Sequence, residues 1–312
     1  MTELRGILHG EATARNLGFL RIWVFAAWFA DVAKNPITDL AALPIGSMTP
    51  VGVLRLVPMS VWEWVCTAEH LRAAYVLMLV ALLLTALGVR PYRPIAIFTC
   101  LLLTLYQGLT LSFTYMGHST LAALPVAYVV AVFPSANALA LRRSPPREGK
   151  RETAVLAMVT ATLVFCATYS CIAARRFQTG GLEIFLDETL LKYVARNSLV
   201  SGFFEQGYGL ATLENPWLSA GLLVGFPLVT LFELLSPLCL FHRGFRWAWL
   251  AVILPFHVLT WYLMQLLFVH NILLIAVLIL RIDRLLPLAG LAAGQLGRRF
   301  RRPARRPRGA GR

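Results

Sequence analysis

Long apolar runs separated by short polar segments dominate the pattern of this 312-residue chain. A run of about 20 apolar residues can cross the ~30 Å hydrocarbon core of a bilayer as an α-helix. The pattern predicts eight such helices, at about 17–33, 70–88, 94–115, 120–141, 153–174, 217–240, 247–264 and from a break at 265–271 to 286. We therefore predict an all-α fold, a polytopic integral-membrane helical bundle with about eight transmembrane helices.

The break divides one apolar run, 247–280, which as a single helix would measure roughly 50 Å and overshoot the bilayer. Residues 182–196 alternate apolar and charged positions at helical spacing, which predicts a helix on the membrane surface. The predicted domains are a cytoplasmic N-terminal segment (1–16), a transmembrane domain (17–286) and an Arg-rich cytoplasmic tail (287–312).

Composition agrees with this class: 58% of the residues are hydrophobic and only 14% are charged. Arginines cluster in alternate loops, and the positive-inside rule then predicts that both termini are cytoplasmic (N-in/C-in). Eight of the 29 Lys and Arg residues lie in the last fifteen positions. Beside membrane spans, this tail indicates contact with anionic lipids and not with nucleic acid. We expect a multi-pass protein of the cell membrane whose partner is the lipid bilayer.

Two ionisable residues lie deep in the predicted membrane region. Glu233 is about ten residues before the basic turn 242–246, and His257 is about eleven residues after it. At ~1.5 Å per residue both lie roughly 15 Å from the turn, so they can face each other near mid-membrane. An intramembrane ionisable residue is costly and predicts a functional site. A structural alternative remains open, in which a Glu233–His257 hydrogen bond only joins two helices.

Other polar residues gather at the predicted outer ends of the helices: Asp31, His118, Arg175, Arg176 and His270. An outward-facing cavity could hold them together with Glu233 and His257. Each has a structural alternative, as an interface residue, a helix cap or a lipid-headgroup contact. Arg21, at the inner end of the first span, is expected to extend toward the near membrane surface. The five cysteines form no metal-binding spacing with His, so we predict no metal site.

Several short motifs together resemble the horizontally transferred transmembrane domain (HTTM) family. They are RIW…AD at 21–31, LP…TP at 43–50, GH at 117–118, AARRF at 173–177, FELLSPL at 232–238 and PFH at 255–257. The family includes the membrane part of vitamin K-dependent γ-glutamyl carboxylase, and the resemblance covers roughly residues 10 to 280. It implies a helix bundle with an outward-opening site and a ligand such as a quinone or a reduced vitamin K-like molecule.

The sequence departs from the family at the residue that matters most. In the carboxylase a lysine of the motif after span five serves as the base, and Arg176 stands at that place here. Arginine stays protonated and cannot act as a general base, although it can hold an anion or an oxyanion. By this argument Glu233, His257 and Arg176 are the catalytic candidates, and His118, Arg175, His270 and Asp31 are ligand-binding candidates.

Three functions remain open from the sequence. The first is an HTTM-like membrane protein that binds a lipid- or quinone-like ligand, with carboxylation doubtful. The second is a non-catalytic accessory in secretion, maturation or immunity. The third is a small-solute transporter, which the lack of sequence repeats disfavours.

Overall fold

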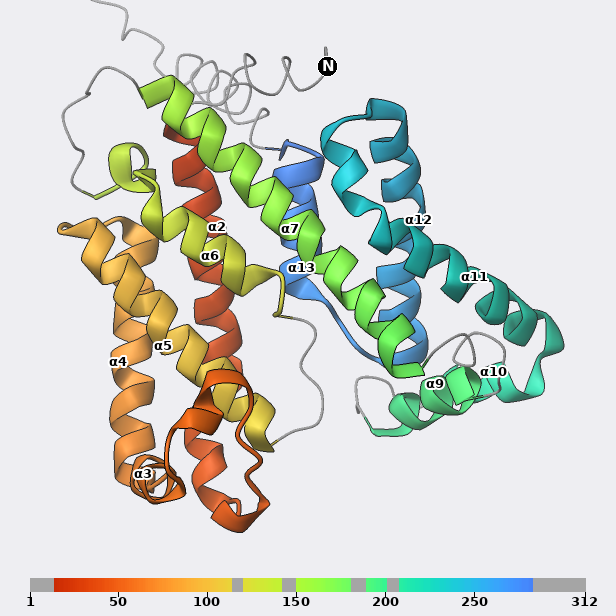
Figure 1. Cartoon of the computed structure of the whole chain (residues 1–312), viewed down its shortest axis with the longest axis horizontal. Helices are drawn as coiled ribbons and strands as arrows, with labels where there is room; N and C mark the ends of the chain where they lie inside the picture. Colours follow the sequence, from red (N-terminus) through yellow and green to blue (C-terminus); the bar gives the residue numbers. More distant parts are fainter. Residues whose placement is uncertain (1–13, 114–119, 142–149, 181–188, 201–207, 283–312) are drawn as a thin grey trace, which may run out of the picture.

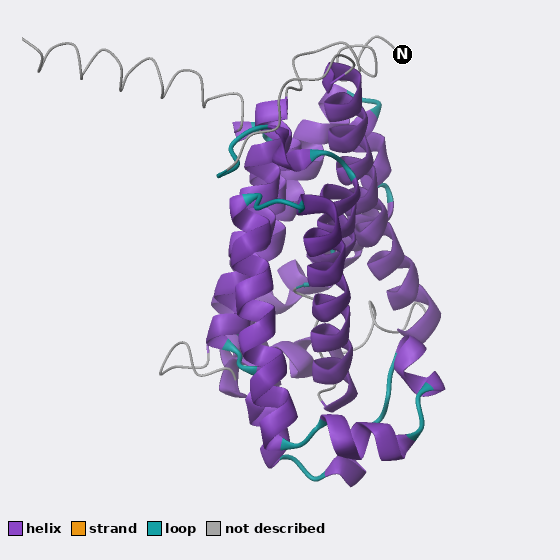
Figure 2. Cartoon of the chain, turned by 90° about the vertical axis from the view of Figure 1, so that its left-hand side faces the viewer, coloured by secondary structure: helices purple, strands orange, loops and turns teal. Residues whose placement is uncertain are grey.

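The computed structural model describes residues 14–113, 120–141, 150–180, 189–200 and 208–282, and every regular element in these ranges is helical. Most of the long helices run roughly along one common direction in an elongated bundle (Figures 1 and 2). The predicted all-α fold class is therefore confirmed. The α-helices are α2 (Ala14–Lys34), α3 (Met59–Val65), α4 (Ala68–Leu87), α5 (Tyr92–Phe113), α6 (Ala123–Val132), α7 (Lys150–Gly180), α9 (Thr189–Val200), α10 (Ala211–Glu214), α11 (Pro216–Leu234), α12 (Arg243–Met264) and α13 (Val269–Leu274).

Six of the described helices are long and apolar enough to cross a membrane: α2, α4, α5, α7, α11 and α12. Two further apolar helices are shorter, Ala123–Val132 and Val269–Ile279, the second ending in a π-helical turn. The helix predicted at 120–141 is thus wrong in extent. It ends early because Pro134 supplies no backbone N–H and disfavours helical geometry at Phe133. The helix predicted from the break at 265–271 to 286 is helical over 269–279, and its predicted end at 283–286 lies outside the described residues.

Proline also shortens the helix predicted at 217–240. α11 ends at Leu234, and residues Ser236–Leu240 form a 3₁₀-helix around Pro237. At its other end α11 begins cleanly, because the Asn215 side chain accepts hydrogen bonds from the N–H groups of Trp217 (3.0 Å) and Leu218 (3.2 Å). The expected break after span seven is confirmed: α12 ends at Met264, residues 265–268 are not helical, and α13 follows.

α2 is the central helix of the larger part of the bundle. It packs against α4, α6, α7 and α13, and its side chains Phe25 and Trp28 are completely buried (Figure 1). A second, smaller apolar cluster joins α9 to α11 and the end of α12, through Leu190, Val194 and Leu263. The predicted surface helix at 182–196 is described from 189 on, as α9, and its apolar positions face this cluster while Lys192 and Arg196 are exposed.

Arg21 does not extend to a membrane surface, contrary to expectation, because it is fully buried. Its guanidinium donates to backbone carbonyls of Ala86 (3.2 Å), Ser135 (2.7 Å), Ala138 (3.4 Å) and Leu139. These carbonyls belong to the last turn of α4 and to the irregular chain after α6, where helical hydrogen bonds end. A buried cation there satisfies acceptors that would otherwise lack partners.

Candidate functional site

An ion pair between α7 and α11 forms the first part of the candidate site. The Arg176 Nη1 donates to Oε2 of Glu233, and Nη2 donates to Oε1 at 3.4 Å. Nη1 also donates to the Thr230 hydroxyl at 3.2 Å, and the guanidinium lies 5.0 Å from the centre of the Phe226 ring. Phe226, Thr230 and Glu233 are spaced four and three residues apart, so one face of α11 surrounds the arginine.

Hydroxyl groups hold the end of α11 against α7 and so fix the height of Glu233. Ser170 Oγ donates to the carbonyl of Leu234 at 2.8 Å, and Ser236 Oγ donates to the carbonyl of Cys166 at 2.6 Å. The last carbonyls of a helix have no intrahelical donor, and Ser170 satisfies one of them.

The two partners of the ion pair differ in exposure. The Glu233 side chain is only 3% exposed, whereas the Arg176 side chain is 21% exposed. The guanidinium neutralises the buried carboxylate, and part of the Arg176 side chain is exposed at the surface. Arg176 can therefore present N–H groups to an oxygen of a bound molecule, whereas Glu233 is enclosed.

A second pair joins α7 to α12. The Tyr169 hydroxyl lies 2.7 Å from Nε2 of His257, and both side chains are buried. Tyr169 and Arg176 are seven residues apart, which places them two turns apart on one face of α7. Asn271, at the start of α13, is buried as well, and its Oδ1 has no hydrogen-bond partner. When the hydroxyl donates to Nε2, neutral His257 carries its hydrogen on Nδ1, and that buried atom has no hydrogen-bond partner.

The direct Glu233–His257 contact expected from their matched depth does not occur. None of the hydrogen bonds or ion pairs within the described ranges joins them: Glu233 pairs with Arg176, and His257 pairs with Tyr169. Helix rise fixes depth but leaves the direction of each side chain around its helix undetermined, so matched depth was insufficient.

The outer candidates Asp31 and His270 form a separate pair. Oδ2 of Asp31 lies 3.7 Å from Nε2 of His270, and the Asn35 side-chain amide donates to Oδ1 of Asp31 at 3.0 Å. The His270 ring packs on the ring of Trp28, with centroids 4.8 Å apart. The first span and the start of α13 thus meet through residues that are 239 positions apart in sequence.

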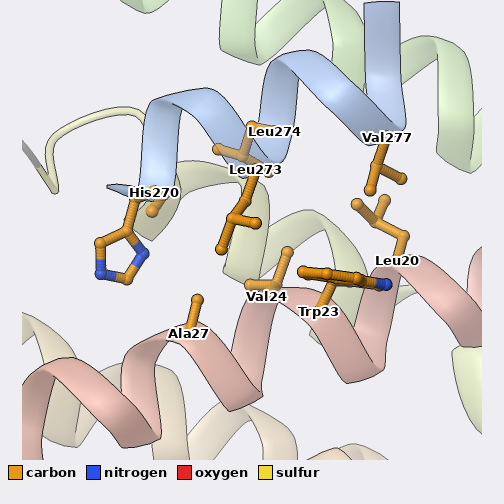
Figure 3. Close-up of a pocket in the computed structure, with 9 residues that line it drawn as sticks. Leu20, Trp23, Val24, Ala27, His270, Leu273, Leu274 and Val277 are labelled. Atoms are coloured by element: carbon orange, nitrogen blue, oxygen red, sulfur yellow. The ribbon is translucent and has the colours of Figure 1, made fainter. Parts of the chain in front are cut away.

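A small pocket lies beside His270, between α2, α6 and α13, and Figure 3 shows most of its lining. Apart from His270 and Trp23 the lining is aliphatic, and the space is about that of one water molecule. This pocket is too small for a quinone or a lipid chain.

The remaining candidates lie apart from these pairs. Arg175 is exposed on the α7 surface, beside Arg176 in sequence but on another face. His118 lies outside the described residues. The structure thus brings Arg176 and Glu233 together, and Asp31 and His270 together, without joining all seven candidates in one cavity. No cluster of three or more metal-ligating side chains occurs within the described ranges.

Sequence reasoning missed Tyr169, Thr230 and Asn271. Tyr169 carried a usable signal, because it lies seven residues before Arg176 in an apolar span. Thr230 and Asn271 carried none, since a threonine or an asparagine within a span often bonds to its own helix.

Comparison with known proteins found no matching protein-family model, no matching curated protein and no matching solved structure.

Proposed function

We propose that the chain is a multi-pass protein of the cell membrane with eight crossings and both termini in the cytoplasm. The six long apolar helices and the two shorter ones support this number, provided that the short helices cross together with the non-helical residues next to them. The arginines of the connections after α4 and after α11 support the orientation. In this arrangement the Arg-rich tail faces anionic cytoplasmic lipids, and the protein contacts no nucleic acid.

For its function, we propose that the protein binds a lipid- or quinone-like molecule at the Arg176–Glu233 pair, through an anionic or carbonyl oxygen. One observation carries this proposal: Arg176 is anchored by a fully enclosed carboxylate but is itself 21% exposed. A guanidinium held in this way offers oriented N–H groups without the cost of ordering the side chain on binding. The unpartnered Nδ1 of His257 supports the presence of a second donor within the same group of helices.

Within this proposal the protein belongs to the HTTM family but does not carboxylate glutamate. The sequence motifs support the membership, and the position of Arg176 argues against the carboxylase reaction. The site offers no lysine at that place, and a guanidinium, which stays protonated, cannot accept the substrate proton. The chemistry that remains for Arg176 is the binding or stabilisation of an oxyanion.

Ligand retention tests the proposed function directly. The protein is purified in mild detergent, extracted with organic solvent, and the extract is compared by mass spectrometry among wild type, Arg176→Lys and Arg175→Lys. Lysine keeps the charge but loses the planar fork, so Arg176→Lys should retain at least about tenfold less of the bound molecule. Arg175→Lys changes the exposed neighbour and should retain as much as wild type.

A non-catalytic accessory is the second candidate function. It is favoured by the ion pair itself, because both carboxylate oxygens of Glu233 already accept hydrogen bonds from Nη1 and Nη2 of Arg176. This ion pair can join α7 to α11 without any bound molecule. In that case no lipophilic molecule is enriched in wild type over Arg176→Lys, and the substitution changes only the melting temperature.

The orientation has its own test, because it does not depend on the ligand. Cysteines are introduced one at a time at exposed positions, in a chain carrying Cys66→Ser and Cys171→Ser. Ser47→Cys and Glu214→Cys should react with an impermeant maleimide added to intact cells, and Arg90→Cys and Arg243→Cys should react only after lysis. Labelling of Arg243→Cys in intact cells contradicts the proposed orientation.

A further inference from the structure

The connection between α12 and α13 is unusual for the interior of an apolar helical bundle. α12 ends at Met264, the next four residues are not helical, and helix resumes at Val269. In Figure 1 this segment runs from the foot of α12 up to α13, which begins part-way along the bundle. Four residues span at most ~13 Å when fully extended, which Gln265 with a φ of 58° is not, and the eleven residues Val269–Ile279 add ~16 Å. Together they reach at most the ~30 Å of a crossing.

Non-helical backbone at membrane depth is found where protein covers it or where it lines water. The polar groups around the start of α13 indicate which of these two cases applies.

Residues at the start of α13 lie against two different polar pairs. His270 meets Trp28 and Asp31 of α2. Phe268, just before α13, packs on the ring of His257 with centroids 5.2 Å apart, and Asn271 is buried three residues later. The first turn of α13 thus connects the Asp31–His270 pair to the buried Tyr169–His257 pair.

Buried polar atoms without partners concentrate along this same connection. Six such side-chain atoms occur within the described ranges. Three belong to residues that contact Tyr169 or His270, Trp28 Nε1, Trp249 Nε1 and His257 Nδ1, and a fourth, Asn271 Oδ1, belongs to the residue after His270. Each unpaired group costs about 1–3 kcal/mol if it stays dry. A water molecule needs two to four polar partners, and this set supplies both donors and an acceptor.

The opposite side of His270 is apolar. The pocket that continues from His270 along α2 is lined by Leu20, Val24, Leu274 and Val277, and a cavity with such a lining stays dry. Figure 3 shows these aliphatic side chains between the two helices, on the side of His270 toward the start of α2. Water that reaches His270 therefore enters from the Asp31 end.

We propose that a short file of water molecules runs from Asp31 and His270 past Asn271 to His257, and that it opens only at the end of the bundle where Asp31 lies. This file gives the buried Tyr169–His257 pair access to protons from one side of the membrane. The inference does not depend on which ligand Arg176 binds, or on whether it binds one.

Hydrogen exchange of the indole N–H groups tests the inference on the unaltered protein. The chain is labelled with ¹⁵N-tryptophan, reconstituted in lipid nanodiscs and transferred to D₂O, with Trp28 and Trp249 assigned from their Phe variants. Both indoles are fully buried, so without internal water they should keep their protons for hours. We expect both to exchange at least tenfold faster than the indole of Trp62, which is also buried but donates to the carbonyl of Leu54 at 3.3 Å. Protection of Trp28 and Trp249 equal to that of Trp62 overturns the proposal.

Cysteine accessibility tests the direction of the file. In a chain whose five native cysteines are replaced by alanine, Asn271→Cys is compared with Leu274→Cys, a buried position on the same element that lines the apolar pocket. Silver ion, which travels only through water, is added to one side of proteoliposomes, and thiols left unreacted are alkylated after denaturation. Asn271→Cys should react at least tenfold faster than Leu274→Cys, and only from the Asp31 side. Equal rates, or reaction from the other side, contradict the proposal.

Discussion

Two arginines within the bundle are held in opposite ways, and the contrast separates a structural charge from a candidate functional one. Arg21 is fully buried and donates to four backbone carbonyls. Arg176 is partly exposed and pairs with a carboxylate. All three nitrogens of the Arg21 guanidinium are engaged, so Arg21 has nothing to offer a ligand.

The surroundings of the two side chains differ accordingly. Gly88 has a φ of +69°, and a Cβ there would lie 2.8 Å from Nη1 of Arg21, so the chain closes tightly around this arginine. Arg176 lies on the same face of α7 as Tyr169, two turns away, and the His257 bound to Tyr169 has a buried Nδ1 without a partner. A saturated charge indicates a structural role, and spare donors near a partly exposed charge indicate binding.

The largest effect is expected at Arg21. Arg21→Met should lower stability by at least ~3 kcal/mol, because it leaves several buried carbonyls without donors. For a chain of 312 residues a loss of this size lowers the melting temperature in detergent by about 5 °C. Arg15→Met removes the same charge from an exposed position of α2 and serves as the control. Equal melting temperatures for the two variants would mean that the Arg21 contacts contribute nothing.

The ion pair should show a smaller, coupled effect. Arg176→Met and Glu233→Gln should each destabilise by ~2 kcal/mol, because each leaves a polar partner behind, and the exposure of Arg176 moderates the loss. The double variant should be more stable than the sum of the two losses predicts, with a coupling of ~1–2 kcal/mol. Unfolding midpoints of the four proteins in mixed micelles give this value. Strict additivity would contradict the ion pair.

The hydrogen bond between Tyr169 and His257 should couple more weakly. Polar contacts between membrane helices contribute ~0.6 kcal/mol on average, and we expect a coupling of that size for Tyr169→Phe with His257→Ala. A double-mutant cycle of Glu233→Gln with His257→Ala is the internal control, and the coupling free energy between these two residues should be near zero. A larger coupling for Glu233 with His257 would restore the direct pairing predicted from their depth.

The last prediction is that the protein does not carboxylate glutamate. Given reduced vitamin K, a glutamate-containing peptide and labelled CO₂, the purified protein should incorporate no label above a protein-free control, because Arg176 cannot accept the proton. Incorporation by wild type would place the reaction at another base and would remove the argument that Arg176 is a binding residue.

The sequence predicted the fold class and the positions of the long helices, because runs of about 20 apolar residues leave few alternatives to a membrane helix. It predicted the break after Met264 for the same reason, since an uninterrupted helix would be too long. It missed the early ends of the helices at Val132 and Leu234, although Pro134 and Pro237 mark both places. The residues after these prolines are still apolar, which favours a longer membrane helix, whereas the prolines favour an early end. The prediction followed the apolar residues and was wrong at both ends.

The candidate site was less predictable from the sequence than the fold. Residue type singled out Glu233, His257 and Arg176, since ionisable groups are conspicuous in apolar runs. Their partners depend on the rotation of each helix about its axis, which depth arguments do not supply. Arg21 was misjudged for a related reason: its acceptors are carbonyls of irregular backbone near Ser135 and Leu139, and a sequence pattern that predicts a helix there conceals them.

The half-length helix at Val269–Ile279 has a consequence for the biogenesis of the protein. This helix has eleven residues, of which His270 and Asn271 are polar, and is shorter than the ~17–25 residues that let a segment partition into lipid on its own during translocation. The contacts of His270 and Leu274 with α2 and of Val277 with the core must then retain this segment, so it integrates only after α2 is already in place. We therefore expect the membrane insertion of this segment to depend on α2, and truncations that remove α2 should leave Val269–Ile279 outside the bilayer.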